Sequence, residues 1–107
     1  MAEVLVLVDH VEGAVRKPTL ELLTLARRIG DPVAVALGAG AEATAGVLGE
    51  HGAVKVLTAD GPEFADYLVV PKVDALQAAF DAISPVAVLV VSSAEGKEIA
   101  ARLALRV

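Results

Sequence analysis

Four runs of consecutive apolar residues, separated by segments with helical spacing, constrain the fold of this chain most strongly. We expect these runs to be strands, and they cover residues 4–8, 33–37, 54–57 and 86–91. Strands that are apolar at every position are typically buried on both faces, and their alternation with helices is typical of a parallel sheet. The sequence therefore predicts an α/β fold with three layers, a parallel sheet with helices on both faces. The turns that end the strands should share one edge of that sheet.

The predicted helices carry apolar stripes with steps of three and four residues, the spacing of one helix face. The first helix begins near Pro18 and ends before Gly30, and its stripe comprises Leu22, Leu25, Ala26 and Ile29. A second helix, rich in Ala and Gly, is expected over about residues 41–51. The stripe of the third comprises Leu76, Ala79, Phe80 and Ile83, and that of the fourth comprises Ala100, Leu103, Ala104 and Val107.

Composition narrows the class of protein. The 107 residues suffice for one domain, and 56% are hydrophobic although only 3% are aromatic, so the core consists of Val, Leu, Ile and Ala. The net charge of −5 and the absence of a Lys/Arg cluster argue against a nucleic-acid partner. Without cysteine the chain has no disulfide, Cys-ligated zinc or iron–sulfur cluster. Since Met1 leads directly into a strand and no apolar run reaches the roughly 18 residues that span a bilayer, we expect a cytoplasmic protein that is not membrane-embedded.

The carboxy-terminal helix reaches Val107 without a glycine, a proline or a following strand, so it lacks the usual signals that end a helix. With right-handed crossovers the last strand lies at an edge of the sheet, although it is the most apolar of the four. We therefore expect residues 1–107 to be a truncated domain whose exposed edge is covered by a continuation of the chain or by a partner.

The junction between the last strand and the last helix is the first candidate site. Ser92 and Glu95 have the spacing of a capping box, in which each side chain accepts a hydrogen bond from the other residue's backbone N–H. The same helix N-terminus could instead bind an anion, with Ser92, Ser93, Gly96 and Lys97 as ligand-binding candidates. Capping alone accounts for the pattern.

A second candidate follows the second strand. Residues 38–43 read GAGAEA and match the loose dinucleotide pattern G-x-G-x-x-G/A, with Gly38 and Gly40 as candidate binding residues and Asp60 about twenty residues on. This pattern predicts an NAD or adenine-nucleotide site. The competing interpretation is a tight strand-to-helix turn, because the chain is rich in Ala and Gly and the motif does not follow the first strand.

A third candidate is a phosphoacceptor receiver domain with Asp60 as the acceptor. Asp9, Asp60 and the pair Ser92-Ser93 each follow a predicted strand. A receiver also needs a second acid beside Asp9, where this chain has His10, and a lysine after a fifth strand. Without the acid pair Mg²⁺ would be held poorly.

The remaining polar residues predict no catalytic or metal site. His10 and His51 are the only histidines, and neither has the spacing with acids that a metal site or a catalytic triad requires. We interpret His10 as a turn residue, and Gly61-Pro62 as marking a turn. The chain is therefore not expected to be an enzyme by itself.

Several segments, in their order and spacing, carry a family resemblance. Residues 4–10 read VLVLVDH, residues 22–30 LLTLARRIG, residues 35–38 VALG, residues 50–57 EHGAVKVL and residues 92–104 SSAEGKEIAARLA. Together they resemble the amino-terminal domain of the electron transfer flavoprotein α subunit. Lys97 stands where that family often has arginine and Ala101 where it often has proline, which puts in doubt any role needing a bidentate guanidinium.

This resemblance implies an adenine nucleotide α hydrolase-like, Rossmann-like domain from an FAD-containing heterodimer of α and β subunits. Such proteins are electron carriers. They accept electrons from acyl-CoA dehydrogenases of fatty-acid oxidation and from other dehydrogenases, and pass them to a membrane-bound quinone oxidoreductase. FAD lies mainly in the carboxy-terminal domain of α and AMP in the β subunit. The domain formed by residues 1–107 would then be scaffold and subunit interface, with no flavin-binding residue of its own.

Overall fold

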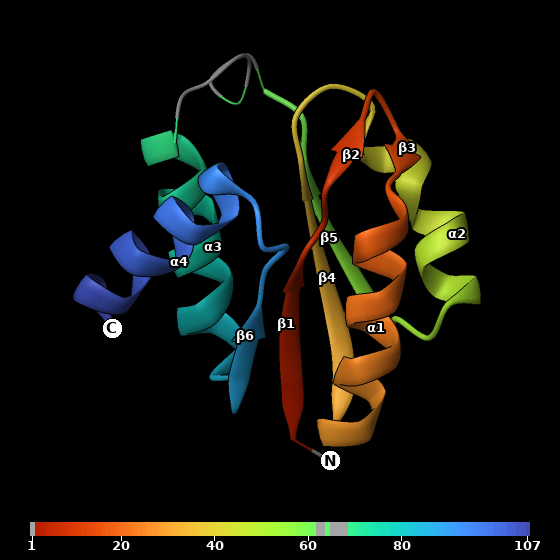
Figure 1. Ribbon diagram of the computed structural model, residues 1–107, viewed down its shortest axis with the longest axis horizontal. Helices are drawn as coiled ribbons and strands as arrows, with labels where there is room; N and C mark the ends of the chain where they lie inside the picture. Colours follow the sequence, from red (N-terminus) through yellow and green to blue (C-terminus); the bar gives the residue numbers. More distant parts are fainter. Residues whose placement is uncertain (1, 62–63, 65–68) are drawn as a thin grey trace.

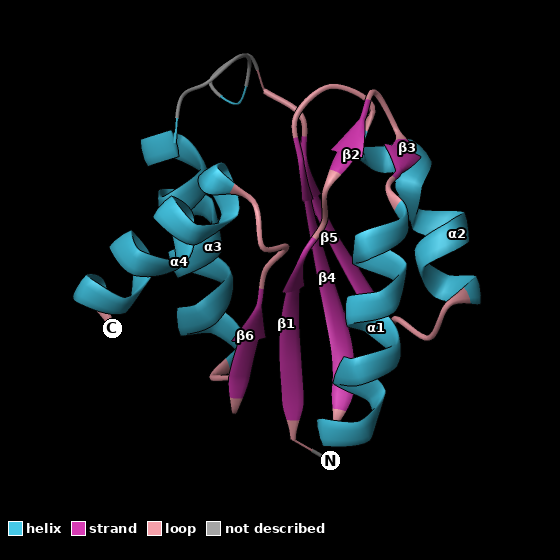
Figure 2. Cartoon of the chain, in the orientation of Figure 1, coloured by secondary structure: helices cyan, strands magenta, loops and turns pink. Residues whose placement is uncertain are grey.

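A parallel sheet lies between two layers of helices in the computed structural model, which describes residues 2–61, 64 and 69–107 (Figures 1 and 2). Its strands are β1 (Glu3–Leu7), β4 (Asp31–Leu37), β5 (Lys55–Ala59) and β6 (Ala87–Leu89), in the order β5-β4-β1-β6. One face is covered by α1 (Lys17–Ile29), the 3₁₀ turn η1 (Ala41–Thr44) and α2 (Ala45–Glu50), and the other by α3 (Val69–Ile83) and α4 (Ala94–Arg106). The predicted three-layer α/β fold is confirmed.

Alternating side chains of the two central strands build two separate cores. In β1, Val4 and Val6 face α1 and α2, whereas Leu5 faces α3 and α4. In β4, Ala34 joins the first core and Val33 the second. All five are fully buried, as the period of two along a strand requires when both faces are covered.

The buried stripe of α1 differs from the predicted one. Thr19, Leu23 and Ala26 are fully buried, whereas Leu25 and Ile29 are about half exposed. The prediction is confirmed for Ala26 and wrong for Leu25 and Ile29. The buried stripe begins with a polar residue: the Thr19 hydroxyl accepts a hydrogen bond from the backbone N–H of Asp9, so Thr19 is buried without losing a hydrogen bond.

Two other helices also depart from expectation. The segment expected as one helix over residues 41–51 is split into η1 and α2, in keeping with Gly46 and Gly49, which disfavour a helix interior. In α4 the buried residues are Gly96, Ile99 and Leu103, whereas Ala104 and Val107 of the predicted stripe are exposed. The stripe of α3 is confirmed, with Leu76 and Ala79 buried and the other two residues half-buried.

Strand boundaries shift by a few residues. β5 ends at Ala59, two residues beyond the predicted end, and Val54 lies before it with 62% of its surface exposed. β6 is shorter than predicted, because only Ala87–Leu89 pair with β1. It lies at an edge of the sheet, as expected, and all four strands are parallel, so their carboxyl ends share one edge.

A short antiparallel hairpin follows β1 and was not predicted. It consists of β2 (His10–Val11) and β3 (Ala14–Val15). The turn residues Glu12 and Gly13 have φ values of 48° and 91°, and positive φ at both positions is the conformation of a type I′ turn. His10 therefore begins a hairpin strand and is not itself the turn.

The turn expected at Gly61-Pro62 lies partly outside the described residues. Among the helices of the described part of the chain, none is long and apolar enough to cross a membrane.

Candidate functional site at the carboxyl edge of the sheet

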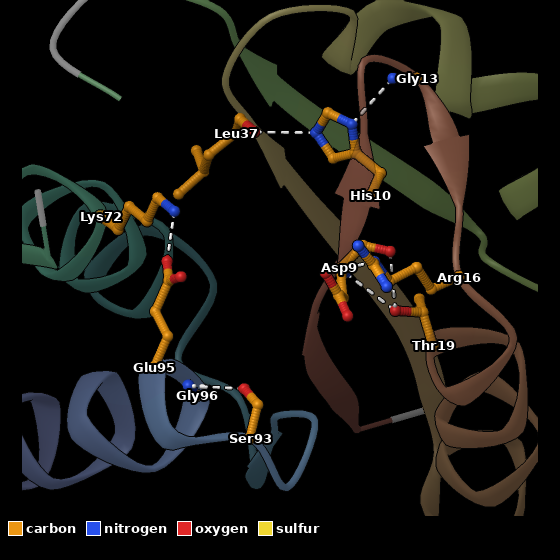
Figure 3. Close-up of polar contacts among 10 residues, drawn as sticks. All are labelled: Asp9, His10, Gly13, Arg16, Thr19, Leu37, Lys72, Ser93, Glu95 and Gly96. Atoms are coloured by element: carbon orange, nitrogen blue, oxygen red, sulfur yellow. Dashed lines mark hydrogen bonds and ion pairs between the residues drawn. The ribbon is translucent and has the colours of Figure 1, made fainter. Parts of the chain in front are cut away.

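A crevice of about 270 Å³ opens where β1 and β6 end side by side (Figure 3). The helix that follows β1 packs on one face of the sheet and the helix that follows β6 on the other, so this is the point where the strand order reverses, the usual ligand position in open α/β sheets. Its polar lining residues are Asp9, His10, Arg16, Lys72, Ser93 and Glu95.

One wall is formed by the end of β1 and the start of α1. The backbone N–H of Asp9 donates to Thr19 Oγ1 over 2.8 Å, and the Asp9 carboxylate lies 3.6 Å from Arg16 Nε. This ion pair is weak because both side chains are at least 40% exposed. This wall therefore carries one acidic and one basic side chain that are both accessible to solvent.

The His10 ring uses both of its nitrogens. The backbone N–H of Gly13 donates to Nδ1 over 3.0 Å, so the neutral ring carries its hydrogen on Nε2, which donates to the carbonyl oxygen of Leu37 over 2.8 Å. The ring thus ties the β2–β3 hairpin to the end of β4. Figure 3 shows both contacts of the ring, which leave neither nitrogen available as a base, so the role of His10 is structural.

The opposite wall contains an ion pair between α3 and α4. Lys72 Nζ donates to Glu95 Oε1, and only 18% of the Lys72 side chain is exposed. The predicted capping box is therefore wrong on both counts. Glu95 contacts Lys72, and the N-cap of α4 is Ser93, whose hydroxyl accepts from the Gly96 N–H over 3.0 Å.

Gly96 is required by a close approach of the strand end. A Cβ at this position would lie 2.2 Å from the carbonyl oxygen of Val91, where no real side-chain atom fits. Of the four candidates at this junction, Ser93 and Gly96 line the crevice, whereas Ser92 and Lys97 are exposed and are not among its lining residues.

Neither Gly38 nor Gly40 lines the crevice, and Gly40 lies against the β2–β3 hairpin. A Cβ on Gly40 would be 2.4 Å from the carbonyl carbon of Glu12, and its φ is +81°. The hairpin thus occupies the space that a pyrophosphate would need for a close approach to this backbone. The segment that follows is a 3₁₀ turn and not the α-helical N-terminus of a dinucleotide site. The structure favours the tight-turn interpretation.

The receiver constellation is not assembled. Asp60 follows β5, and β4 lies between β5 and β1. Two strand spacings are about 10 Å, so the strand order separates Asp60 from Asp9. In the flavodoxin-like order of receiver domains the third strand adjoins the first.

The crevice does not fit an FAD. Its volume is below the roughly 300–1,000 Å³ of pockets that hold drug-sized ligands, and FAD is larger still. Among the described residues there is no group of three or more His, Cys, Asp or Glu side chains that could hold a metal ion. The arrangement is suited to holding two helices and a hairpin in fixed positions.

Sequence reasoning missed three residues that shape this crevice, namely Arg16, Thr19 and Lys72. Arg16 and Thr19 flank the start of the first helix, where a polar residue capable of binding the preceding loop is common. Lys72 gave no signal, because its partner Glu95 is 23 residues away in the chain.

Comparison with known proteins places the chain in a family. A model of the electron transfer flavoprotein domain matches residues 4–107. The electron transfer flavoprotein subunit alpha of Mycobacterium tuberculosis (strain H37Rv) is 45% identical over 109 residues, covering 100% of this chain and 34% of its own length. That of Syntrophomonas wolfei is 36% identical, covering 97% of this chain and 33% of its own length.

A subunit named lactate dehydrogenase (NAD(+),ferredoxin) subunit LctC, from Acetobacterium woodii, is 33% identical, covering 94% of this chain and 25% of its own length. The chain thus spans about a third or less of the length of these relatives. The match of residues 4–107 to the family model covers every described helix and strand except the first residue of β1. The chain belongs to the electron transfer flavoprotein domain family.

Proposed function

We propose that residues 1–107 are the amino-terminal domain of an electron transfer flavoprotein α subunit, where they act as scaffold and as subunit interface. The observation that carries this proposal is the 45% identity across the whole chain to an α subunit about three times as long. In the complete protein FAD supplies the redox chemistry. It is held mainly by the carboxy-terminal domain of α, and the β subunit holds AMP.

The complete protein is an electron carrier in the cytoplasm. It accepts electrons from acyl-CoA dehydrogenases of fatty-acid oxidation and from other dehydrogenases, and it delivers them to a membrane-bound quinone oxidoreductase. This domain contributes no electron-carrying group. It holds the α and β subunits in a fixed position relative to each other.

The contact surface is the carboxyl edge of the sheet, at the turns near Asp9, Gly38 and Ser93. The side chains of His10, Ser93 and the Lys72–Glu95 pair are held there by hydrogen bonds, which supports a rigid docking surface. Exposed charges surround it, among them Glu42 after β4 and Lys97 in the first turn of α4. Such charges tune association when they lie at the rim of an interface.

The test measures the affinity of the α subunit for the β subunit. Glu42→Lys and Lys97→Glu each reverse a charge at the carboxyl edge, and Asp81→Lys makes the same kind of change near the end of α3, at the opposite edge. We expect the first two to weaken the heterodimer by roughly three- to tenfold, equal to about 0.7–1.4 kcal/mol, and the third to leave it unchanged. Equal affinities for all three variants and the unmodified protein would defeat the proposed interface.

A further inference from the structure

The ring of His10 makes two hydrogen bonds of opposite direction, and only the neutral ring makes both. Nδ1 accepts from the backbone N–H of Gly13 over 3.0 Å, and Nε2 donates to the carbonyl oxygen of Leu37 over 2.8 Å (Figure 3). A second proton on the ring occupies Nδ1 and turns it into a donor, so that two N–H groups face each other at Gly13. The bond to Leu37 remains and becomes charge-assisted. Protonation therefore removes one contact of the ring and keeps the other.

The turn that contains Gly13 is strained. Glu12 has a φ of 48°, in the left-handed region that residues with a Cβ rarely adopt. The strands on either side of the turn, His10–Val11 and Ala14–Val15, have only two residues each, and strands this short hold a hairpin weakly. The hydrogen bond from Gly13 to the ring thus stabilises a turn whose own backbone favours another conformation.

The base of the hairpin is anchored independently of the ring. The backbone N–H of Arg16 donates to the carbonyl oxygen of Asp9 over 2.9 Å, and the backbone N–H of Asp9 donates to Thr19 Oγ1 over 2.8 Å. Backbone amides and a threonine hydroxyl do not titrate near neutral pH. A change of charge at His10 is therefore confined to the turn and leaves the start of α1 in place.

The other ionisable side chains that line the crevice beside the ring form two ion pairs. They are Asp9 with Arg16 on the same wall, and Lys72 with Glu95 on the opposite wall. The hairpin turn and η1, against which the hairpin packs, carry the exposed acids Glu12 and Glu42. Among the described residues that line the crevice, each cation is thus paired with a carboxylate. No uncompensated positive charge there opposes a second proton on the ring.

We propose that the β2–β3 hairpin is a pH-sensitive switch: when His10 binds a second proton, the turn at Glu12 and Gly13 detaches from the ring, while the ring keeps its bond to Leu37. Histidine is the side chain that ordinarily changes charge between about pH 5 and pH 8. Since His10 and Val11 line the crevice, acid loosens one of its walls. This inference rests on the hydrogen bonds of the ring and not on the proposed function.

Hydrogen–deuterium exchange of the complete protein, isolated with its second subunit, tests the switch. The protection of the Gly13 amide, corrected for the intrinsic exchange rate, is compared at about pH 7.5 and about pH 5. We expect it to fall about tenfold or more in acid, while the Leu23 amide in α1 keeps its protection. Equal protection of Gly13 at both pH values would overturn the proposal. So would a parallel loss at Leu23, because the acid would then unfold the whole domain.

Two matched variants assign the effect to one ring. His10→Asn replaces the titrating acceptor with an amide oxygen that is an acceptor at either pH, so Gly13 should show the same protection at both. His51→Asn removes the other histidine of residues 1–107, at an exposed site after α2, and should leave the loss at Gly13 unchanged. A loss in acid that persists in His10→Asn, or that disappears in His51→Asn, would contradict the proposal.

NMR spectra of isotope-labelled histidine in the unmodified protein give a second readout that does not depend on how a variant folds. The His10 ring signals are identified by their absence in His10→Asn. We expect the neutral ring to carry its hydrogen on Nε2, and the loss of protection at Gly13 to follow the appearance of the doubly protonated ring. A doubly protonated ring with an unchanged Gly13 amide would overturn the switch.

Discussion

His10 and Leu37 join two strand ends that are 27 residues apart: the Nε2 hydrogen of His10 is donated to the Leu37 carbonyl oxygen over 2.8 Å. The same ring accepts the Gly13 N–H on Nδ1. One side chain therefore fixes the hairpin against β4 and shapes one wall of the crevice at the carboxyl edge.

Replacing His10 should destabilise the fold. In His10→Ala both Leu37 O and Gly13 N–H lose a partner in a half-buried place, so we expect the free energy of unfolding to fall by about 1–3 kcal/mol. His51→Ala, at an exposed site just after α2, is the control and should change it by less than about 0.5 kcal/mol. Urea denaturation followed by circular dichroism measures both. Equal stabilities of the two variants would show that the ring does not hold the hairpin.

The glycine at position 40 should be structurally essential. Gly40→Ala places a Cβ 2.4 Å from the carbonyl carbon of Glu12 in a backbone conformation with positive φ, so we expect a loss of about 2 kcal/mol or more. At Gly46 in α2 a Cβ would have no atom within 4 Å beyond its own helix turn, so Gly46→Ala should stabilise by about 0.4–1 kcal/mol. Thermal unfolding of the two variants distinguishes them, and a neutral Gly40→Ala would show that the hairpin does not press on this backbone.

Alanine variants of two neighbouring serines test which of them is the N-cap of α4. Ser93→Ala removes the acceptor of the Gly96 N–H and should cost about 0.5–2 kcal/mol. Ser92→Ala changes a side chain one residue earlier that caps nothing in this helix, and should fall within about 0.5 kcal/mol of the unmodified protein. The comparison of their urea midpoints is decisive. A larger loss at Ser92 would restore the capping box that the sequence predicts.

The Lys72–Glu95 pair should couple α3 to α4. A double-mutant cycle with Lys72→Met and Glu95→Gln should give a coupling energy of about 0.5–1 kcal/mol, because the lysine is largely shielded from solvent while Glu95 is 42% exposed. The exposed pair between Glu98 and Arg102 within α4 serves as the reference, with an expected coupling of about 0.3–0.5 kcal/mol. A coupling near zero for the first pair would show that packing alone holds the two helices.

The layers of the fold could be predicted from the sequence because strands buried on both faces must be apolar throughout. The residues at which the strands end were harder to predict. The run at residues 86–91 is uniformly apolar, and nothing in it shows that pairing with β1 stops at Leu89. The stripe of α1 was misjudged because Thr19 is buried through a hydrogen bond to a residue ten positions away.

The candidate site was predictable only in part. Ser93 and Gly96 were found because a strand that runs into a capped helix has a local signature. The hairpin was not, since Glu12-Gly13 lacks the Asn-Gly or Asp-Gly signal of a type I′ turn. Lys72 and Glu95 meet through tertiary packing, for which no local pattern exists. The role of Gly40 likewise depends on the hairpin that lies against it.

The most direct test of the central claim is the visible absorption spectrum of the native protein that contains this sequence, purified from its source without added cofactor. We predict flavin bands from a chain longer than residues 1–107, accompanied by a second subunit. A colourless protein without a second subunit would contradict the claim.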